Sequence, residues 1–302
     1  SVVSMNGMFN SAHSFNQPVG NWDISSVNTI HQMFKGAISF NQPLGNWNVS
    51  AVTSMGEMFN GASSFNQDIS DWNISSVTNL NYSFVGTPAL SNINMGLIHS
   101  SFSSNPNWPY DWRQYVVIDD SNFQTAVDLW FDNQAEANAT YGHISNWNTS
   151  AVSDMSDAFK DRTAFNEDIG GWDTSSVTKM DGMFQNASSF NQNIGDWNTS
   201  NVNSMAKMFR NASAFNQPIG DWNTSAVFNM KGLFFGATLF NHNINDWNVS
   251  SVTNMESMFH LAKSFNQPLN FWDVSKVTKM NYMFRSASMF NQTVGDWNVS
   301  SV

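Results

Sequence analysis

The sequence predicts an α/β solenoid of 25-residue coils, each with one short strand and one short helix, interrupted by helical capping segments. Three observations support this: a tryptophan that recurs at a fixed interval, an apolar stripe with helical spacing, and a short polar segment with apolar positions along it. A strict period of roughly 20–50 residues is typical of repeats that stack on their neighbours. We therefore expect a protein that presents a surface rather than one that carries out a reaction.

The tryptophans define the period. Their interval is 25 residues within two groups, and the gap between Trp72 and Trp147 equals three intervals. The members of this structural ladder are Trp22, Trp47, Trp72, Trp147, Trp172, Trp197, Trp222, Trp247, Trp272 and Trp297. Stacking of coils should place each of these rings on the next.

The first half of each repeat carries the stripe that predicts a helix. In one repeat it consists of Val52, Met55, Met58, Phe59 and Ala62, a spacing that places apolar side chains on one helical face. The preceding serine is a plausible N-cap. The same pattern returns through both groups of repeats, so we expect one short helix in each coil.

The second half of each repeat predicts a short strand. Phe65, Ile69 and Trp72 are apolar positions separated by polar residues, in a segment too short for a helix. Neighbouring strands lie about 4.8 Å apart. We therefore expect residues 66–72 and their equivalents to form a parallel sheet on one wall of the solenoid.

An asparagine follows the recurrent phenylalanine and should form a second ladder. Its clearest members are Asn41, Asn66, Asn191, Asn216, Asn266 and Asn291. An amide side chain both donates and accepts, so a column of them can satisfy the loop backbone of each coil. This device is typical of leucine-rich repeats and makes the predicted solenoid leucine-rich-repeat-like. A metal-binding ladder is the alternative interpretation.

The period breaks between the two groups of repeats, which predicts three regions. Residues 1–86 form a first array, 87–143 an interruption, and 144–302 a second array. Solenoids need caps that cover the apolar edge of their outermost coil. We therefore expect residues 87–117 to close the first array and a helical segment, 118–143, to open the second.

The interruption contains the candidate interaction residues Trp108, Tyr110, Asp111 and Trp112. The rings could complete the cap of the first array, or they could be exposed and contact a ligand. Exposed rings beside polar groups would favour recognition, whereas rings buried in the cap would count against it.

Composition excludes several classes of protein. The formal net charge is −11, with 23 acidic against 12 basic residues, which argues against binding to nucleic acid or to an anionic membrane surface. No cysteine is present, so there can be no disulfide, thiol catalysis or cysteine-ligated metal. No apolar run approaches the roughly 20 residues of a membrane span. We expect no membrane insertion.

We find no pattern that indicates catalysis. The histidines do not form a metal-ligand spacing, and none recurs at a repeat position. The sequence also lacks a nucleophile elbow, a phosphate-binding loop and a dinucleotide fingerprint. We therefore expect no enzyme activity, no catalytic residue, no cofactor and no metal site.

The repeat unit resembles the Mycoplasma-lipoprotein-type repeat of bacterial surface proteins, which are related to BspA-like leucine-rich-repeat proteins. Its pattern is Phe-Asn-Gln-x-Ile-Gly-x-Trp-Asn-x-Ser-x-Val-Thr-x-Met-x-x-Met-Phe-x-x-Ala, with clear instances at residues 40–62, 190–212 and 265–287. The resemblance implies an extracellular or cell-surface repeat protein with an adhesive or structural role. It assigns no catalytic residue.

The ends of the chain share one phase of the repeat, since Val302 stands twelve periods after Val2. We expect either end-to-end self-association or continuation in a longer chain, because complementary, non-identical ends build filaments. The predicted function is a segment or unit of an elongated surface fibre or stalk. The alternative is a module of a surface adhesin that recognises glycans or the proteins of a host or neighbouring cell. Binding to ice or mineral is a third and weaker hypothesis. The position two residues after the tryptophan is threonine only at Thr149, Thr174, Thr199 and Thr224, so a regular threonine array is absent from the sequence.

Overall fold

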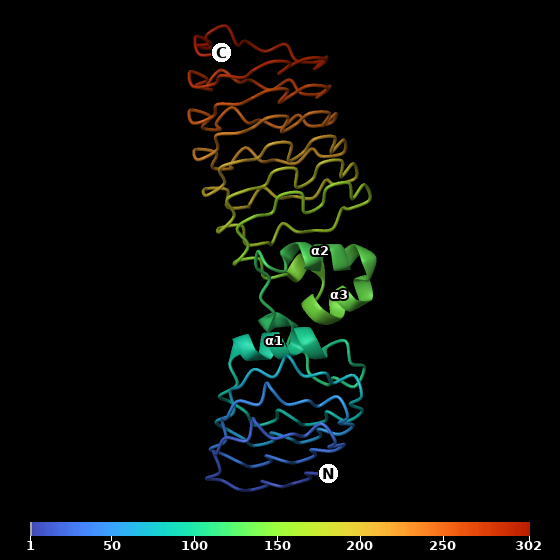
Figure 1. Cartoon of the computed structure of the whole chain (residues 1–302). Helices are drawn as coiled ribbons and strands as arrows, with labels where there is room; N and C mark the ends of the chain where they lie inside the picture. Colours follow the sequence, from blue (N-terminus) through green and yellow to red (C-terminus); the bar gives the residue numbers. More distant parts are fainter. Residues whose placement is uncertain (1) are drawn as a thin grey trace. The chain divides into compact units, whose positions relative to one another are not determined.

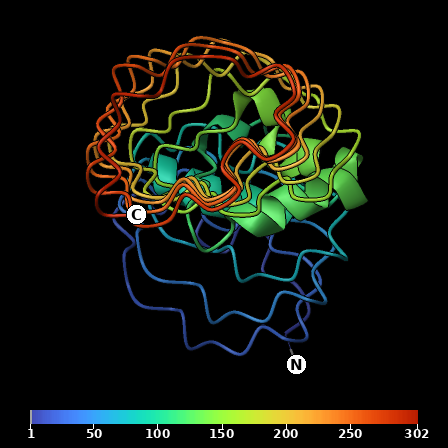
Figure 2. The same ribbon diagram turned by 90° about the horizontal axis from the view of Figure 1, so that it is seen from above.

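A computed structural model describes residues 2–302, which form two compact units (Figure 1). Unit 1 comprises the chain up to Val117 together with Ala135–Gly142. Unit 2 comprises Ile118–Gln134 and His143–Val302. In each unit the chain winds into stacked coils, and seen from above the coils of unit 2 superimpose closely (Figure 2).

The predicted α/β, leucine-rich-repeat-like solenoid is wrong. Within the described residues the coils contain no strand, and every helical element lies between residues 92 and 146. The elements are the α-helices α1 (Asn92–Phe102), α2 (Phe123–Asp132) and α3 (Gln134–Tyr141), and the 3-10 turns η1 (Arg113–Tyr115) and η2 (Ile144–Asn146). The coils themselves consist of consecutive turns.

Hydrogen bonding explains why the apolar stripe is not helical. The N–H groups of Ile30, Gln32, Phe34 and Gly36 donate to carbonyls of the next coil, at 2.7–3.0 Å. The residues between them, Met33, Lys35 and Ala37, donate to carbonyls three positions back in the same coil, at 3.0–3.2 Å. A helix would use all these N–H groups internally. The turns instead leave every second one free to join the coils.

This ribbon of turns needs two left-handed residues in each coil. Gln32 has a φ of 56° and Gly36 has a φ of 67°, and the equivalent positions of the other coils are also positive. The second position often holds glycine or asparagine, the residues that adopt this conformation most readily. Examples are Gly36, Gly61, Gly86, Asn186, Asn211 and Gly236. Their recurrence is a sequence signal for turns that the helical spacing concealed.

The predicted strand at residues 66–72 is wrong for a related reason. The backbone turns again between Ile69 and Trp72, whose N–H donates to the Ile69 carbonyl at 3.1 Å. Sheet-like pairing survives only as isolated parallel bridges at a different part of the coil, such as Thr29 with Ser54 and Ser54 with Asn79. Turns on either side prevent these bridges from extending into strands.

Aromatic columns form the core of each array. Within one coil Phe184 stacks on Phe190 with ring centroids 3.9 Å apart, and between coils it stacks on Phe209 at 5.6 Å. Both phenylalanine columns are almost wholly buried, together with the recurrent methionines. Burial of this repeated apolar set is the main source of stability in the coils.

Helices close one end of each array. In unit 1, Ile98 and Phe102 of α1 are buried against the last regular coil. In unit 2, Phe123, Val127 and Trp130 of α2 are buried, and the Phe123 ring meets the Trp172 ring edge-on at 5.8 Å. These helices therefore supply the apolar surface that a further coil would otherwise supply.

Candidate functional site

The tryptophan column links the coils through its indole N–H groups. In eight of the ten tryptophans of the column, Nε1 donates to a carbonyl 28 residues earlier in the chain. Examples are Trp222 to Ile194 at 3.0 Å and Trp247 to Ile219 at 2.9 Å. The same bond is made by Trp47, Trp72, Trp172, Trp197, Trp272 and Trp297. Trp147 lies buried beneath the Trp172 ring, whereas Trp22 is 36% exposed.

The asparagine column links the coils through a different set of bonds. The Asn191 side-chain oxygen accepts the Asn216 N–H at 2.9 Å, and Gln217 donates to the Asn191 carbonyl at 2.9 Å. Asn41, Asn66, Asn266 and Asn291 take part in the same ladder. These side chains are occupied with backbone groups and with neighbouring amides.

The candidate interaction residues of the interruption pack in the cap of unit 1. Trp108, Tyr110 and Trp112 are half-buried, and all three meet the ring of Phe84 edge-on at 5.3–6.1 Å. The Tyr110 hydroxyl accepts the Phe84 N–H at 2.9 Å. Asp111 lies at the surface in a two-pronged ion pair with Arg113. The burial of these rings favours a capping role over ligand contact.

A buried histidine holds this cap together. The side chain of His99 is 3% exposed; its Nδ1 accepts the Trp108 indole N–H at 2.9 Å, and its Nε2 donates to the Ala139 carbonyl at 3.0 Å. Burial lowers the pKa of His99 below its ordinary value of 6.5, although the Ala139 bond opposes this. The Trp108 bond requires the neutral ring, because protonation would turn Nδ1 into a donor facing another donor, whereas Nε2 donates to Ala139 in either form.

Acid should therefore loosen unit 1. Since the pKa of His99 is lower in the folded protein, its stabilising effect is complete above pH 6.5 and is lost as the pH falls through the folded pKa. Hydrogen exchange of residues 92–105, measured in the full chain and corrected for intrinsic pH dependence, should accelerate between pH 7.5 and 5. His99→Gln, whose amide can make both bonds without titrating, should remove this change. Equal acceleration in that variant would contradict the assignment.

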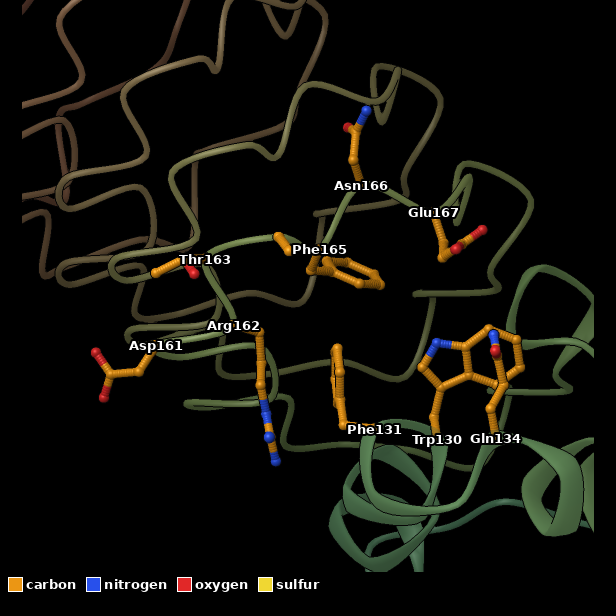
Figure 3. A pocket seen from close by; sticks show the side chains of 10 residues that line it. Trp130, Phe131, Gln134, Asp161, Arg162, Thr163, Phe165, Asn166 and Glu167 are labelled. Carbon is orange, nitrogen blue, oxygen red and sulfur yellow. The ribbon is translucent and has the colours of Figure 1, made fainter.

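A hollow of about 460 Å³ with a mixed polar and apolar lining lies in unit 2, between the end of α2 and the first coil of the array (Figure 3). Trp130 and Phe131 line it from α2, while Arg162, Phe165 and Glu167 line it from the coil (Figure 3). Gln134, Asp161, Thr163, Ala164 and Asn166 complete the lining.

Two backbone donors open into this hollow. In most other coils, the N–H equivalent to that of Ala164 donates to the preceding coil, as Ala214 does to the Ser188 carbonyl at 3.1 Å. The N–H equivalent to that of Asn166 donates to an asparagine side chain wherever another coil precedes it in the array. In residues 2–302 neither Ala164 nor Asn166 has a hydrogen-bond partner for its N–H, because α2 stands where a coil would continue the ladder.

Charged and aromatic side chains set the character of the hollow. The Arg162 guanidinium lies 4.3 Å from the Phe131 ring centroid and donates to Asp128 at 2.9 Å. The Phe131 ring meets Phe165 edge-on at 5.8 Å, in the place of the phenylalanine that a further coil would supply. The Glu167 carboxylate lies 3.8 Å from the ring of His143.

No repeat pattern predicted this hollow, although the residue at position 167 departs from the repeat beside it. Glu167 stands where glutamine recurs in the other coils, at Gln17, Gln42, Gln67, Gln192, Gln217, Gln267 and Gln292. Glutamine donates to the asparagine ladder, and a carboxylate cannot. A change from donor to acceptor at a repeated position marks a coil whose surroundings differ.

No group of three or more histidine, aspartate or glutamate side chains in residues 2–302 is arranged to hold a metal ion. Across the same residues, no helix is both long and apolar enough to cross a membrane.

The protein family follows from the repeats. The family described as a Mycoplasma protein of unknown function, DUF285, matches residues 1–95, 125–232 and 217–302. The chain belongs to the DUF285 family. The match leaves out only residues 96–124, and it confirms the resemblance to Mycoplasma-type repeats at the level of the family. The DUF285 repeats thus include both coil arrays and most of α2. Comparisons with curated proteins and with solved structures find no significant match.

Proposed function

We propose that this DUF285 chain is a structural segment of an elongated, extracellular fibre or stalk with an adhesive role, and that it is not an enzyme. The observation that carries the proposal is the complementarity of the two faces of each coil. The face toward the preceding coil offers indole and amide donors together with turn carbonyls, and the face toward the next coil offers turn N–H donors together with the matching carbonyl and amide acceptors. Such a stack can lengthen indefinitely without a change of design.

Heterologous contacts of this kind produce open assemblies rather than closed dimers. The partner in the fibre is therefore either a further stretch of the same chain or a second copy stacked end to end. The abundance of neutral amides and hydroxyls supports an exposed location. A distant relation to BspA-like surface proteins is part of the same proposal.

Electron microscopy of the source cells tests the fibre. Gold-labelled antibodies against this segment should decorate elongated projections on intact cells. Light scattering of the isolated chain separates the two modes of assembly: a mass that grows with concentration from 33.8 kDa supports stacking of copies, and a constant mass supports one long chain. Label that appears only after the cells are permeabilised would overturn the proposed location and function.

Recognition of another protein is the second candidate function. It is favoured by the hollow beside Arg162 and Glu167, which combines free backbone donors with a weakly paired carboxylate. The half-buried rings of Trp108 and Trp112, which pack in the cap of unit 1, offer less support.

A further inference from the structure

We infer that the hollow of unit 2 binds a short peptide segment that completes the hydrogen-bond ladder interrupted by α2. The segment carries an asparagine followed by a lysine or arginine. This inference does not depend on the proposed fibre.

The same ladder in the other coils shows which acceptors match the free N–H groups of Ala164 and Asn166. At the step between residues 188 and 216, Ala214 donates to the carbonyl of Ser188 and Asn216 donates to the side-chain oxygen of Asn191. The two acceptors are three residues apart on one segment, which leaves a turn closed by the Phe190 N–H and the Ala187 carbonyl. Ala164 and Asn166 present the same pair of donors to the hollow. A peptide with a carbonyl at one residue and an asparagine three residues later has the matching register.

The aromatic ring of Phe131 restricts the middle of the peptide. In a regular coil the residue before the asparagine is a phenylalanine, as Phe190 is beneath Phe215 at 6.0 Å. Here the Phe131 ring already packs against Phe165. The peptide must therefore have a small residue, such as alanine or glycine, before its asparagine, because a second large ring has no room.

Glu167 specifies the residue after the asparagine. A glutamine at this position would donate to the peptide, as Gln217 does to the Asn191 carbonyl. A carboxylate can only accept, and the ring of His143 lies 3.8 Å away, beyond hydrogen-bond distance. It therefore favours a peptide with an ammonium or guanidinium group beside the asparagine, since charge-assisted hydrogen bonds are the stronger kind.

The burial of the aromatic rings favours a peptide over a sugar. Sugars in binding sites usually lie on an open aromatic face, but Trp130 is 4% exposed and the Phe131 ring is covered by Arg162. The polar groups of the lining, which include the N–H groups of Ala164 and Asn166, can pair with a peptide backbone. Since the donors point across a hollow of about 460 Å³, there is room for only a few residues.

Amide NMR of the full chain tests the inference with the peptide acetyl-Ser-Gly-Ala-Asn-Lys-Gly-amide. The amide signals of Ala164 and Asn166 should move on titration, because both N–H groups gain acceptors. Replacing the asparagine of the peptide by alanine should abolish the shift of Asn166. Replacing its lysine by glutamine should weaken binding about tenfold.

Glu167→Gln provides the matched variant, because glutamine occupies this position in most other coils and should leave the fold intact. It should still bind the asparagine peptide but lose the preference for lysine. The inference is overturned if neither amide responds to millimolar peptide, or if the lysine preference survives in Glu167→Gln. It is also overturned if N-acetylglucosamine, but not the peptide, shifts the same two amides, which would assign the hollow to a glycan.

Discussion

Replacement of Trp247 by alanine should lower the free energy of unfolding of unit 2 by about 4 kcal/mol, the largest effect we expect for a single side chain. Trp247 is 2% exposed, and its ring stacks on Trp222 at 6.3 Å and on Phe234 at 6.1 Å. Loss of the side chain leaves a cavity and removes the hydrogen bond that the indole N–H donates to the Ile219 carbonyl. Chemical denaturation of the full chain, with hydrogen exchange read in residues 202–277, measures the change.

Two further variants divide this effect into its parts. Trp247→Phe keeps an aromatic ring but removes the N–H, and should cost only about 1–2 kcal/mol. Trp297→Ala changes a half-buried member of the same column, which has equivalent ring contacts with Trp272 and Phe284, and should cost less than Trp247→Ala. Equal losses at Trp247 and Trp297 would mean that burial of the ring does not determine its contribution to stability.

Replacement of Gly96 by alanine should destabilise unit 1 by about 2–3 kcal/mol, although alanine favours helices. Helix propensity alone predicts a gain of about 1 kcal/mol. However, a Cβ atom on Gly96 would lie 2.1 Å from the Tyr115 carbonyl oxygen and 2.8 Å from its carbon. The backbone of η1 would have to move away from α1, and overpacking of this kind outweighs propensity.

The sign of the change in the free energy of unfolding of Gly96→Ala decides between helix propensity and overpacking. Ile93→Ala is the control, because Ile93 lies in the same helix and is 67% exposed. It should alter the free energy of unfolding by less than about 0.5 kcal/mol. Hydrogen exchange of α1 in the full chain measures both variants. A stabilised Gly96→Ala protein would show that η1 is not held against α1.

The sequence predicted the 25-residue period correctly, but the helix and the strand expected in each coil are turns. A spacing of three, three, one and three residues fits a helical face. It fits the ribbon of turns equally well, because that ribbon also directs Met55, Met58 and Phe59 into the core. Glycine or asparagine at the positions of Gly36 and Asn186 was the discriminating signal, since a helix interior disfavours a left-handed residue.

The candidate site was harder to anticipate. The sequence drew attention to Trp108, Tyr110 and Trp112, which the structure places against Phe84 in a cap. The hollow combines Trp130 and Phe131 of a helix with Arg162 and Glu167 of a coil more than 30 residues later. Periodicity cannot reveal such a site, because it lies where the period is broken.

The sequence by itself determined the 25-residue step, the residues that stack and the family of the protein. These follow from a repeated pattern, because identical side chains one period apart meet whenever coils stack. Only the tertiary structure decided that the coils are turns rather than strands and helices. The backbone conformation depends on which N–H groups bond within a coil and which bond to the next. That division is a property of neighbouring coils in contact, and no single repeat contains it.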